Sequence, residues 1–325
     1  MASRFLSTNC PSTQILTGSA SRKPRLVGGE KGYNVSIVSF PGSPALWAGS
    51  FNFTINRLMF RFSKKGTVEY LEATAFSEFG FLTHAFCTRR GGISGGKFFS
   101  LNFSSREGDS IENVRQNWKI LATAFNLEME QFFAVNQVHG DRILIIDHNA
   151  GDLISHQPYQ CDAIITNQPG LAIGIKTADC VPILFLDKIK RIVGVTHAGW
   201  KGTSLSIAAK VVDTFVKKLL CRADDIIAVI GPAIGPCCYQ VDEVVFNSMK
   251  GDKDRESFLS PCCMQGRWML DLPLANRLQI ISSGILPTNV YTTDYCTSCN
   301  TGIFFSHRRE GGNTGRQLNF IMLAA

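Results

Sequence analysis

Three residues with metal-binding or nucleophilic side chains stand at the ends of short apolar runs. His139 follows one run, Cys180 lies between two others, and His197 follows a fourth. Side chains at strand ends beside turns are held rigidly and remain accessible, as reactive groups must be. Two imidazoles and one thiolate can bind Zn²⁺ and leave its fourth coordination position open. The residue types are therefore compatible with a catalytic metal centre.

The same three residues allow two other interpretations. Cys180 could be a nucleophile with His197 as its base, as in enzymes that hydrolyse amides without a metal, although His139 then has no natural role. Alternatively, the two histidines are ordinary polar turn residues and Cys180 is a core thiol. No Cys-x-x-Cys or His-x-x-x-His unit joins the three residues, so their spacing by itself favours this last interpretation.

Short apolar runs and helical periodicity predict the elements that position these residues. Strands are predicted over residues 132–138, 143–146, 163–166, 171–175, 181–186, 192–196, 226–230, 290–292 and 317–323. The first two of these strands are expected to flank a turn at Gly140 and Asp141. Helices are predicted over residues 111–125, 204–220 and 272–283, the first capped by Ser110 and burying a face with Ile111, Val114, Trp118, Leu121 and Phe125. Because the strands occur in runs, the sequence predicts an α+β fold, with layered mixed β-sheets and flanking helices in a single domain.

The N-terminal segment differs in composition from the rest of the chain. Residues 1–68 contain nine Lys and Arg but one acid, a charge of +8, whereas the whole chain carries +7. The remainder is therefore close to neutral, and we expect no nucleic-acid partner. A basic, Ser-rich segment with few acids is typical of an organelle transit peptide. We expect residues 1–70 to be a plastid transit segment, with a mitochondrion or the cytoplasm as alternatives, and residues 71–325 to be the folded domain.

Cysteine usage and hydropathy restrict the class of protein further. The eleven cysteines are an odd number in a long chain without a secretory signal, which favours reduced thiols. Cys296-x-x-Cys299 has the spacing of zinc ligands, but one such unit is a weak signal. Two further pairs could join it, Cys237-Cys238 and Cys262-Cys263. We expect these cysteines to belong to the scaffold, and the absence of a run of about 18 apolar residues predicts no membrane span.

A series of motifs in fixed order extends from about residue 80 to residue 323. The motifs are Thr88-Arg89-Arg90-Gly91-Gly92-Ile93-Ser94, Ser100-Leu101-Asn102, Gln137-Val138-His139-Gly140, Thr177-Ala178-Asp179-Cys180-Val181-Pro182, His197-Ala198-Gly199-Trp200-Lys201-Gly202, Gly235-Pro236-Cys237-Cys238-Tyr239, Phe305-Ser306-His307-Arg308-Arg309 and Thr314-Gly315-Arg316. Together they resemble the YfiH family, also called the multicopper polyphenol oxidase or laccase-domain family. In that family one histidine, one cysteine and a second histidine of these motifs bind a metal, usually zinc. The resemblance therefore implies that His139, Cys180 and His197 bind zinc, with copper as the alternative.

The resemblance also implies a reaction on purine nucleosides. Members of the family are associated with phosphorolysis of adenosine, inosine and methylthioadenosine, and with deamination of adenosine. Guanidinium groups bind phosphate well, so Arg89 and Arg308 are expected to bind phosphate, and Asn102 is grouped with them as a substrate-binding residue. Asp179, next to Cys180, is expected to transfer the proton that deamination requires. It joins the three metal ligands as an expected catalytic residue.

Copper-dependent oxidation of phenols is an alternative function. Two histidines and one cysteine suit a single blue copper centre. A cluster of further coppers needs many more imidazoles, and the remaining histidines are His84, His148, His156 and His307. A Cys–His amide hydrolase and a non-enzymatic metal-binding protein stay open as well. We predict a zinc-dependent purine nucleoside phosphorylase with adenosine deaminase activity, whose partners are purine nucleosides and phosphate, without nucleic acid or membrane.

Overall fold

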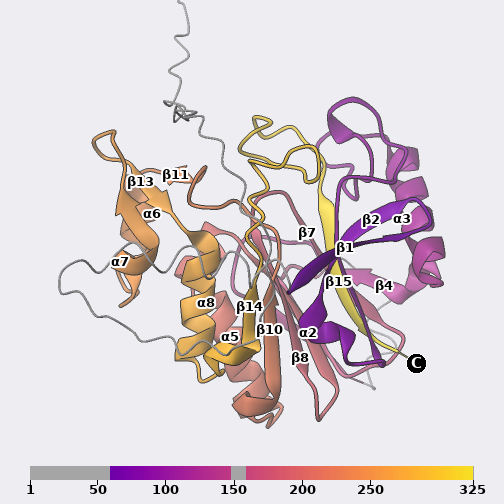
Figure 1. Cartoon of the computed structure of the whole chain (residues 1–325), viewed down its shortest axis with the longest axis horizontal. Coiled ribbons are helices and arrows are strands. Elements are labelled where there is room, and N and C mark those ends of the chain that lie inside the picture. Colours follow the sequence, from indigo (N-terminus) through magenta and orange to yellow (C-terminus); the bar gives the residue numbers. More distant parts are fainter. Residues whose placement is uncertain (1–58, 148–158, 325) are drawn as a thin grey trace, which may run out of the picture. The chain divides into compact units, whose positions relative to one another are not determined.

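Two large β-sheets form the centre of the molecule (Figure 1). The computed structural model describes residues 59–147 and 159–324, and all of these belong to one compact unit. The first sheet consists, in spatial order, of β1 (Phe60–Lys65), β2 (Val68–Ala73), β3 (Leu82–Cys87), β15 (Gln317–Leu323), β7 (Ala172–Thr177) and β4 (Phe132–Ala134). Its neighbours are antiparallel except for β7 and β4, which are parallel.

The second sheet also mixes parallel and antiparallel pairs. Its order is β14 (Val290–Thr292), β10 (Ile226–Ile230), β8 (Val181–Asp187), β9 (Ile192–Ala198), β6 (Ala163–Thr166) and β5 (Ile143–Ile146). The two edge pairs are parallel and the inner pairs are antiparallel. A small third sheet contains β11 (Gln240–Val241), β13 (Trp268–Leu270) and β12 (Leu259–Pro261).

The two large sheets pack face to face, and helices cover their outer faces. On β15, Ile321 lies in the core between the sheets, whereas its neighbour Phe320 packs on Phe125 of α3 (Ile111–Phe125) at a ring distance of 5.0 Å. Alternating residues of one strand thus serve two separate cores. Helices α5 (Ile207–Asp213) and α8 (Leu272–Ser282) cover the second sheet, and Figure 1 shows them on the opposite side from α3. The predicted layered α+β fold is confirmed.

The helix predicted after Ser110 is confirmed, and so is most of its predicted face, because Val114, Leu121 and Phe125 are buried. The Ser110 side chain caps α3 by accepting a hydrogen bond from Asn113 N. Ile111, however, is 78% exposed. The polar Asn117 is fully buried instead, and its amide donates hydrogen bonds to Ser94 Oγ and to the carbonyl oxygens of residues 100 and 102. The apolar pattern did not predict burial of Asn117, because a polar side chain is buried only when its hydrogen bonds are satisfied within the fold.

Two connections differ from the prediction. The strands before and after Gly140 do not form a hairpin, because β4 belongs to the first sheet and β5 to the second. The helix predicted over residues 204–220 is divided into α4 (Trp200–Ser204), α5 and a π-helical turn at Thr214–Lys218. Ser206 has a left-handed φ of 59°, which breaks the helix between α4 and α5.

The folded domain begins before residue 71. Strands β1 and β2 pair along their length, so residues 60–70 belong to the first sheet and the predicted boundary at residue 70 lies too far along the chain. Residues 1–58 of the predicted transit segment lie outside the described residues, and the plastid address stays a prediction.

Short helices α2 (Thr74–Ser77), α6 (Glu243–Ser248) and α7 (Arg255–Phe258) were not predicted. Within the described part of the chain, no helix has the length and apolar character needed to cross a membrane.

Candidate metal centre

Three connections pass from one large sheet to the other at the same end of the molecule. They are residues 135–142 between β4 and β5, 178–180 between β7 and β8, and 293–316 between β14 and β15. Strand register brings them together, since the last residue of β7 pairs with the first residue of β15. All three connections line a pocket of about 460 Å³, a size typical of small-molecule sites.

His139, Cys180 and His197 meet in this pocket. His139 lies on the first connection and Cys180 on the second, whereas His197 lies near the end of β9, paired with Pro182 of β8. One possible ligand atom of each lies within 4.8 Å of the others, and the two imidazole rings meet edge to face at 4.7 Å. A Cβ atom on Gly199 would lie 3.0 Å from Cys180 Sγ and 3.1 Å from His139 Cδ2, so a larger residue there would crowd two of the predicted ligands. The structure therefore brings the three predicted ligands together.

The carboxylate of Asp162 positions both histidines. Asp162 lies just before β6 and is fully buried. Its Oδ1 is 2.8 Å from His197 Nδ1 and accepts a hydrogen bond from His139 N, while its Oδ2 accepts from Gly140 N at 2.7 Å. His139 itself has a left-handed φ of 58°, which these backbone hydrogen bonds stabilise. A carboxylate bonded to one imidazole nitrogen leaves the other nitrogen for a metal, as in many zinc proteins.

The electrostatics of the centre favour a thiolate. Burial alone would raise the pKa of Cys180, but the charge of His197 and hydrogen bonds from both imidazoles lower it to about 6. Burial likewise opposes the charged form of His197, but Cys180 and Asp162 raise its pKa to about 9. Without a metal these groups would form a thiolate–imidazolium pair. Because Cys binds metals as a thiolate, the donor set of two imidazoles and one thiolate fits Zn²⁺ with an open position.

Asp179 and Arg308 line the pocket, but their side chains form hydrogen bonds with other residues of the protein. The Asp179 carboxylate accepts hydrogen bonds from Thr297 Oγ1 and, at 2.6 Å, from Arg308 N. Asp179 also has a φ of 92°, an uncommon value for a residue with a side chain. The Arg308 guanidinium donates to Gln240 O at 2.8 Å and lies 5.0 Å from the centre of the Tyr239 ring. Asp179 is thus placed to hold the third connection against the second.

Arg89 and Asn102 do not line the pocket. The Arg89 guanidinium donates to the carbonyl oxygens of Phe99 and Thr301, pairs with Glu310 at 3.0 Å and covers the ring of Phe305. These contacts use the donors that phosphate would need, so the structure gives Arg89 a scaffold position.

The buried amide of Asn102 also serves the scaffold. Its Oδ1 accepts from Ser104 N and Arg316 N, and its Nδ2 donates to Asp109 Oδ2 and to the carbonyl oxygen of Ser104. The hydrogen-bonding capacity of the amide is therefore filled. Asn102 positions Ser104 and Arg316, which do line the pocket.

A basic group in the pocket was missed by sequence reasoning. Lys176, Arg106 and Arg316 all line it, next to the acid Glu107. Burial and then the charges of Arg106 and Arg316 lower the pKa of Lys176. Within the described residues the Lys176 ammonium has no hydrogen-bond or ion-pair partner, whereas Arg316 pairs with Glu107 at 2.9 Å. The available signal was a lysine at the end of a buried apolar strand, immediately before the Thr177–Cys180 motif.

Comparison with known proteins places the chain in a family. Residues 83–324 match the family described as multi-copper polyphenol oxidoreductase laccase. The chain belongs to this family. The laccase-domain assignment confirms the resemblance that the ordered motifs indicated.

Other members of the laccase-domain family carry the names of enzymes. Purine nucleoside phosphorylase YlmD of Geobacillus stearothermophilus is 38% identical over 244 residues, which cover 72% of this chain and 87% of that protein. Adenosine deaminase RL5, from an unknown prokaryotic organism, is 34% identical over 247 residues, covering 73% of this chain and 92% of RL5. The crystal structure of YfiH from Bacillus licheniformis matches 81% of this chain and 98% of its own with a TM-score of 0.74 at 33% identity. These names support the expectation that this laccase-domain chain is an enzyme.

Proposed function

We propose that this chain is a zinc-dependent purine nucleoside phosphorylase that also deaminates adenosine. The observation that carries the proposal is the juxtaposition, in one pocket, of a three-ligand metal centre and a partly buried cation, Lys176, that has no ion-pair partner among the described residues. The names of the relatives YlmD and RL5 support the two activities. Zn²⁺ held by His139, Cys180 and His197 would supply Lewis acidity to the pocket.

The remaining pocket residues suit the parts of a nucleoside and a phosphate. Lys176 and Arg106 would bind phosphate, because a desolvated ammonium and a guanidinium both attract this anion. Glu107 Oε2 is buried and has no hydrogen-bond partner among the described residues, so it would accept a hydrogen bond from a sugar hydroxyl. Trp200 and Tyr239 add aromatic surface for the purine ring. Asp179 is assigned a positioning role because both of its carboxylate oxygens are engaged.

The test uses the full chain with adenosine, in the presence and absence of phosphate, and separates the products by chromatography. We expect adenine only with phosphate, inosine without it, and neither product from the Cys180→Ala variant. Lys176→Met should raise the KM for phosphate at least about tenfold, the loss expected for about 1.4 kcal/mol of binding, and should leave deamination nearly unchanged. Lys188→Met, a lysine outside the pocket, is the matched control. The absence of both products from metal-loaded protein would overturn the proposal.

One observation favours a second candidate, a metal-independent amide hydrolase. Cys180, His197 and Asp162 have the roles of a nucleophile, a base and an orienting acid, with a Cys180 pKa of about 6. His139 distinguishes the two candidates, because a hydrolase of this kind does not need it. A His139→Ala variant that has lost metal but still cleaves amide substrates would favour the hydrolase, whereas loss of nucleoside turnover together with the metal would favour the phosphorylase.

A further inference from the structure

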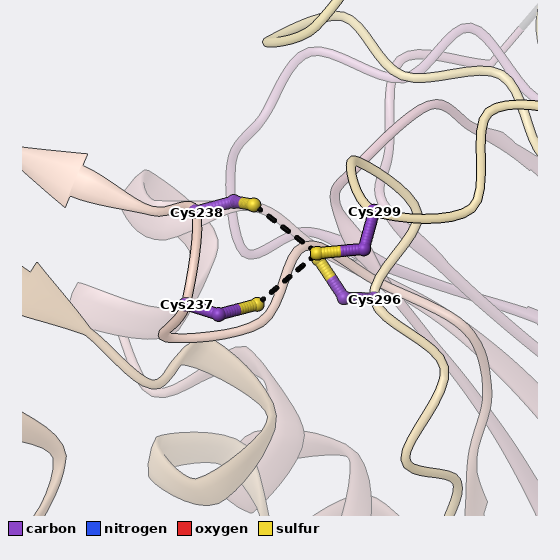
Figure 2. A group of neighbouring side chains, drawn as sticks. All are labelled: Cys237, Cys238, Cys296 and Cys299. Atoms are coloured by element: carbon purple, nitrogen blue, oxygen red, sulfur yellow. Dashed lines mark hydrogen bonds between the residues drawn. The ribbon is translucent and has the colours of Figure 1, made fainter. Parts of the chain in front are cut away.

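Four cysteine side chains from two distant segments converge at one point (Figure 2). Cys237 and Cys238 follow the Gly–Pro loop at residues 231–236, and Cys296 and Cys299 lie in the connection between β14 and β15. The four sulfur atoms all lie within 4.8 Å of one another. Cys299 Sγ is 3.5 Å from Cys237 Sγ and 3.4 Å from Cys238 Sγ. Cys262 and Cys263, the other adjacent pair, are not part of this cluster.

The spacing of the sulfur atoms suits a shared metal ion. Tetrahedral Zn²⁺ with Zn–S distances of about 2.3 Å places its sulfur ligands about 3.8 Å apart. The separations of 3.4 and 3.5 Å are slightly shorter than that value, whereas a disulfide requires about 2.05 Å. All four residues are free thiols. The cluster is therefore arranged as a closed set of four ligands.

Hydrogen bonds between the two cysteine segments, and within the second segment, support the positions of the cysteines. Ala233 forms a parallel bridge with Cys296, and Thr297 N donates to Ala233 O at 2.9 Å. Gly235 N donates to Cys296 Sγ at 3.3 Å. The side-chain amide of Asn300 donates to Cys296 O at 2.8 Å. The ligand positions are thus preorganised by their supporting contacts.

We propose that Cys237, Cys238, Cys296 and Cys299 bind one Zn²⁺ ion in a structural site, separate from the centre at His139, Cys180 and His197. Four thiolates complete a tetrahedral coordination and leave no position for substrate. Soft sulfur ligands also select zinc over hard cations such as Mg²⁺ and Ca²⁺. This site goes beyond the proposed function and does not depend on which reaction the pocket carries out.

The ion would fix one wall of the pocket. Thr297, between two of the ligands, donates to Asp179, which in turn accepts from Arg308 N. The Arg308 guanidinium donates to the carbonyl oxygens of Cys238 and Gln240. A metal that joins the two cysteine segments therefore stabilises the positions of Asp179 and Arg308 without touching the substrate.

The first test is the metal content of the full chain by plasma mass spectrometry. We expect two zinc ions per chain in the wild type, one in Cys180→Ala, one in Cys299→Ser and none in the double variant. Cys263→Ser, which changes an exposed cysteine outside the cluster, should retain both. Unchanged zinc content in Cys299→Ser and in Cys237→Ser would overturn the proposal.

A spectroscopic test leaves the four cysteines of the cluster unchanged. Cobalt bound to Cys180→Ala protein should give intense tetrahedral absorption and thiolate-to-cobalt charge transfer of four-sulfur strength. A cobalt spectrum without thiolate ligation in this background would contradict the proposal. Mass spectrometry that finds a disulfide among the four cysteines in protein purified without reductant, with no second metal, would contradict it as well.

Discussion

At the scale of single residues, Asp162 supports two of the three predicted ligands of the candidate metal centre. Its carboxylate accepts hydrogen bonds from the segment that carries His139 and from the ring of His197. These contacts, together with the His197 charge, outweigh burial and lower the pKa of Asp162. One buried side chain thereby fixes the backbone of one ligand and the ring orientation of another.

We expect Asp162→Asn to weaken zinc binding by about 10–100-fold, the usual effect of removing the carboxylate behind a metal-bound histidine. The asparagine keeps the volume of the side chain but supplies a neutral amide. Competition with a chromogenic chelator measures the affinity. Asp141→Asn is the matched control, because Asp141 lies two residues after His139 and pairs with Lys210 at the surface. Equal zinc affinity in the two variants would show that Asp162 does not orient the ligands.

The sequence identified ligand types more readily than supporting residues. The spacing of the two histidines and the cysteine by itself favoured ordinary turn and core residues, and only the ordered family motifs identified them as metal ligands. Asp162 was missed because its partners lie 22 to 35 residues away and depend on strand pairing. Asn102 belongs to a family motif, but its amide is filled by scaffold contacts, so a motif position alone did not distinguish substrate binding from support.

At the scale of elements, apolar runs predicted nine strands of the two large sheets, but they predicted neither β1, β2 and β3 nor how the strands pair. Strands β4 and β5 follow one another in the sequence, yet they belong to different sheets. Strand partners are set by which faces bury apolar area, and short runs of the same composition fit either sheet. His139 and Cys180 lie on connections between the two sheets. They meet because of the strand order, which the apolar runs did not predict.

Strand β3 provides a prediction about acid stability. His84 is buried in β3, where its Nε2 accepts a hydrogen bond from Ala73 N at 2.9 Å. Burial lowers its pKa to about 4, since the charged ring cannot be solvated; the smaller effect of Glu72 raises the pKa, and the still smaller effect of Arg61 lowers it. The unfolded chain has a His pKa of about 6.5. The stabilisation from neutral His84 is therefore complete above about pH 6.5 and is lost as the pH falls towards 4.

Replacement of His84 by glutamine should remove this pH dependence, because Gln can accept the same hydrogen bond and does not titrate. Between pH 7 and pH 4 we expect the wild type to lose about 3 kcal/mol more unfolding free energy than His84→Gln, on the order of 1.4 kcal/mol per pKa unit. Urea unfolding at several pH values measures the difference, and effects common to both proteins cancel in it. Parallel stability curves would show that His84 does not titrate in this way.

At the scale of the whole molecule, the first strands decide where the domain begins. The segment from β1 to α2 contributes Tyr70, Leu71 and Phe76 to the two cores of the first sheet, each at most 2% exposed. A chain that starts at Gly80 lacks all three side chains, and it leaves β3 without its neighbour β2. A chain that starts at Met59 keeps them.

We expect the chain from residue 80 to be insoluble or largely unfolded, and the chain from residue 59 to unfold cooperatively. Burial of each large apolar side chain contributes about 1.5–3 kcal/mol, so three approach the total stability of a typical domain. Circular dichroism and urea titration of the two truncated proteins compare them directly. Equal unfolding midpoints would mean that β1, β2 and α2 are dispensable for folding.

The connections that carry His139 and Cys180 both pass between the two large sheets. A metal ion bound to them binds the native arrangement alone, so separation of the sheets requires release of the ion. At a free zinc concentration of 100 times the dissociation constant, this linkage adds about 2.7 kcal/mol to the opening free energy. Amide hydrogens in β7 and β8 should then exchange with solvent more slowly as the free zinc concentration increases. The exchange rate of these amides would therefore report the free zinc concentration.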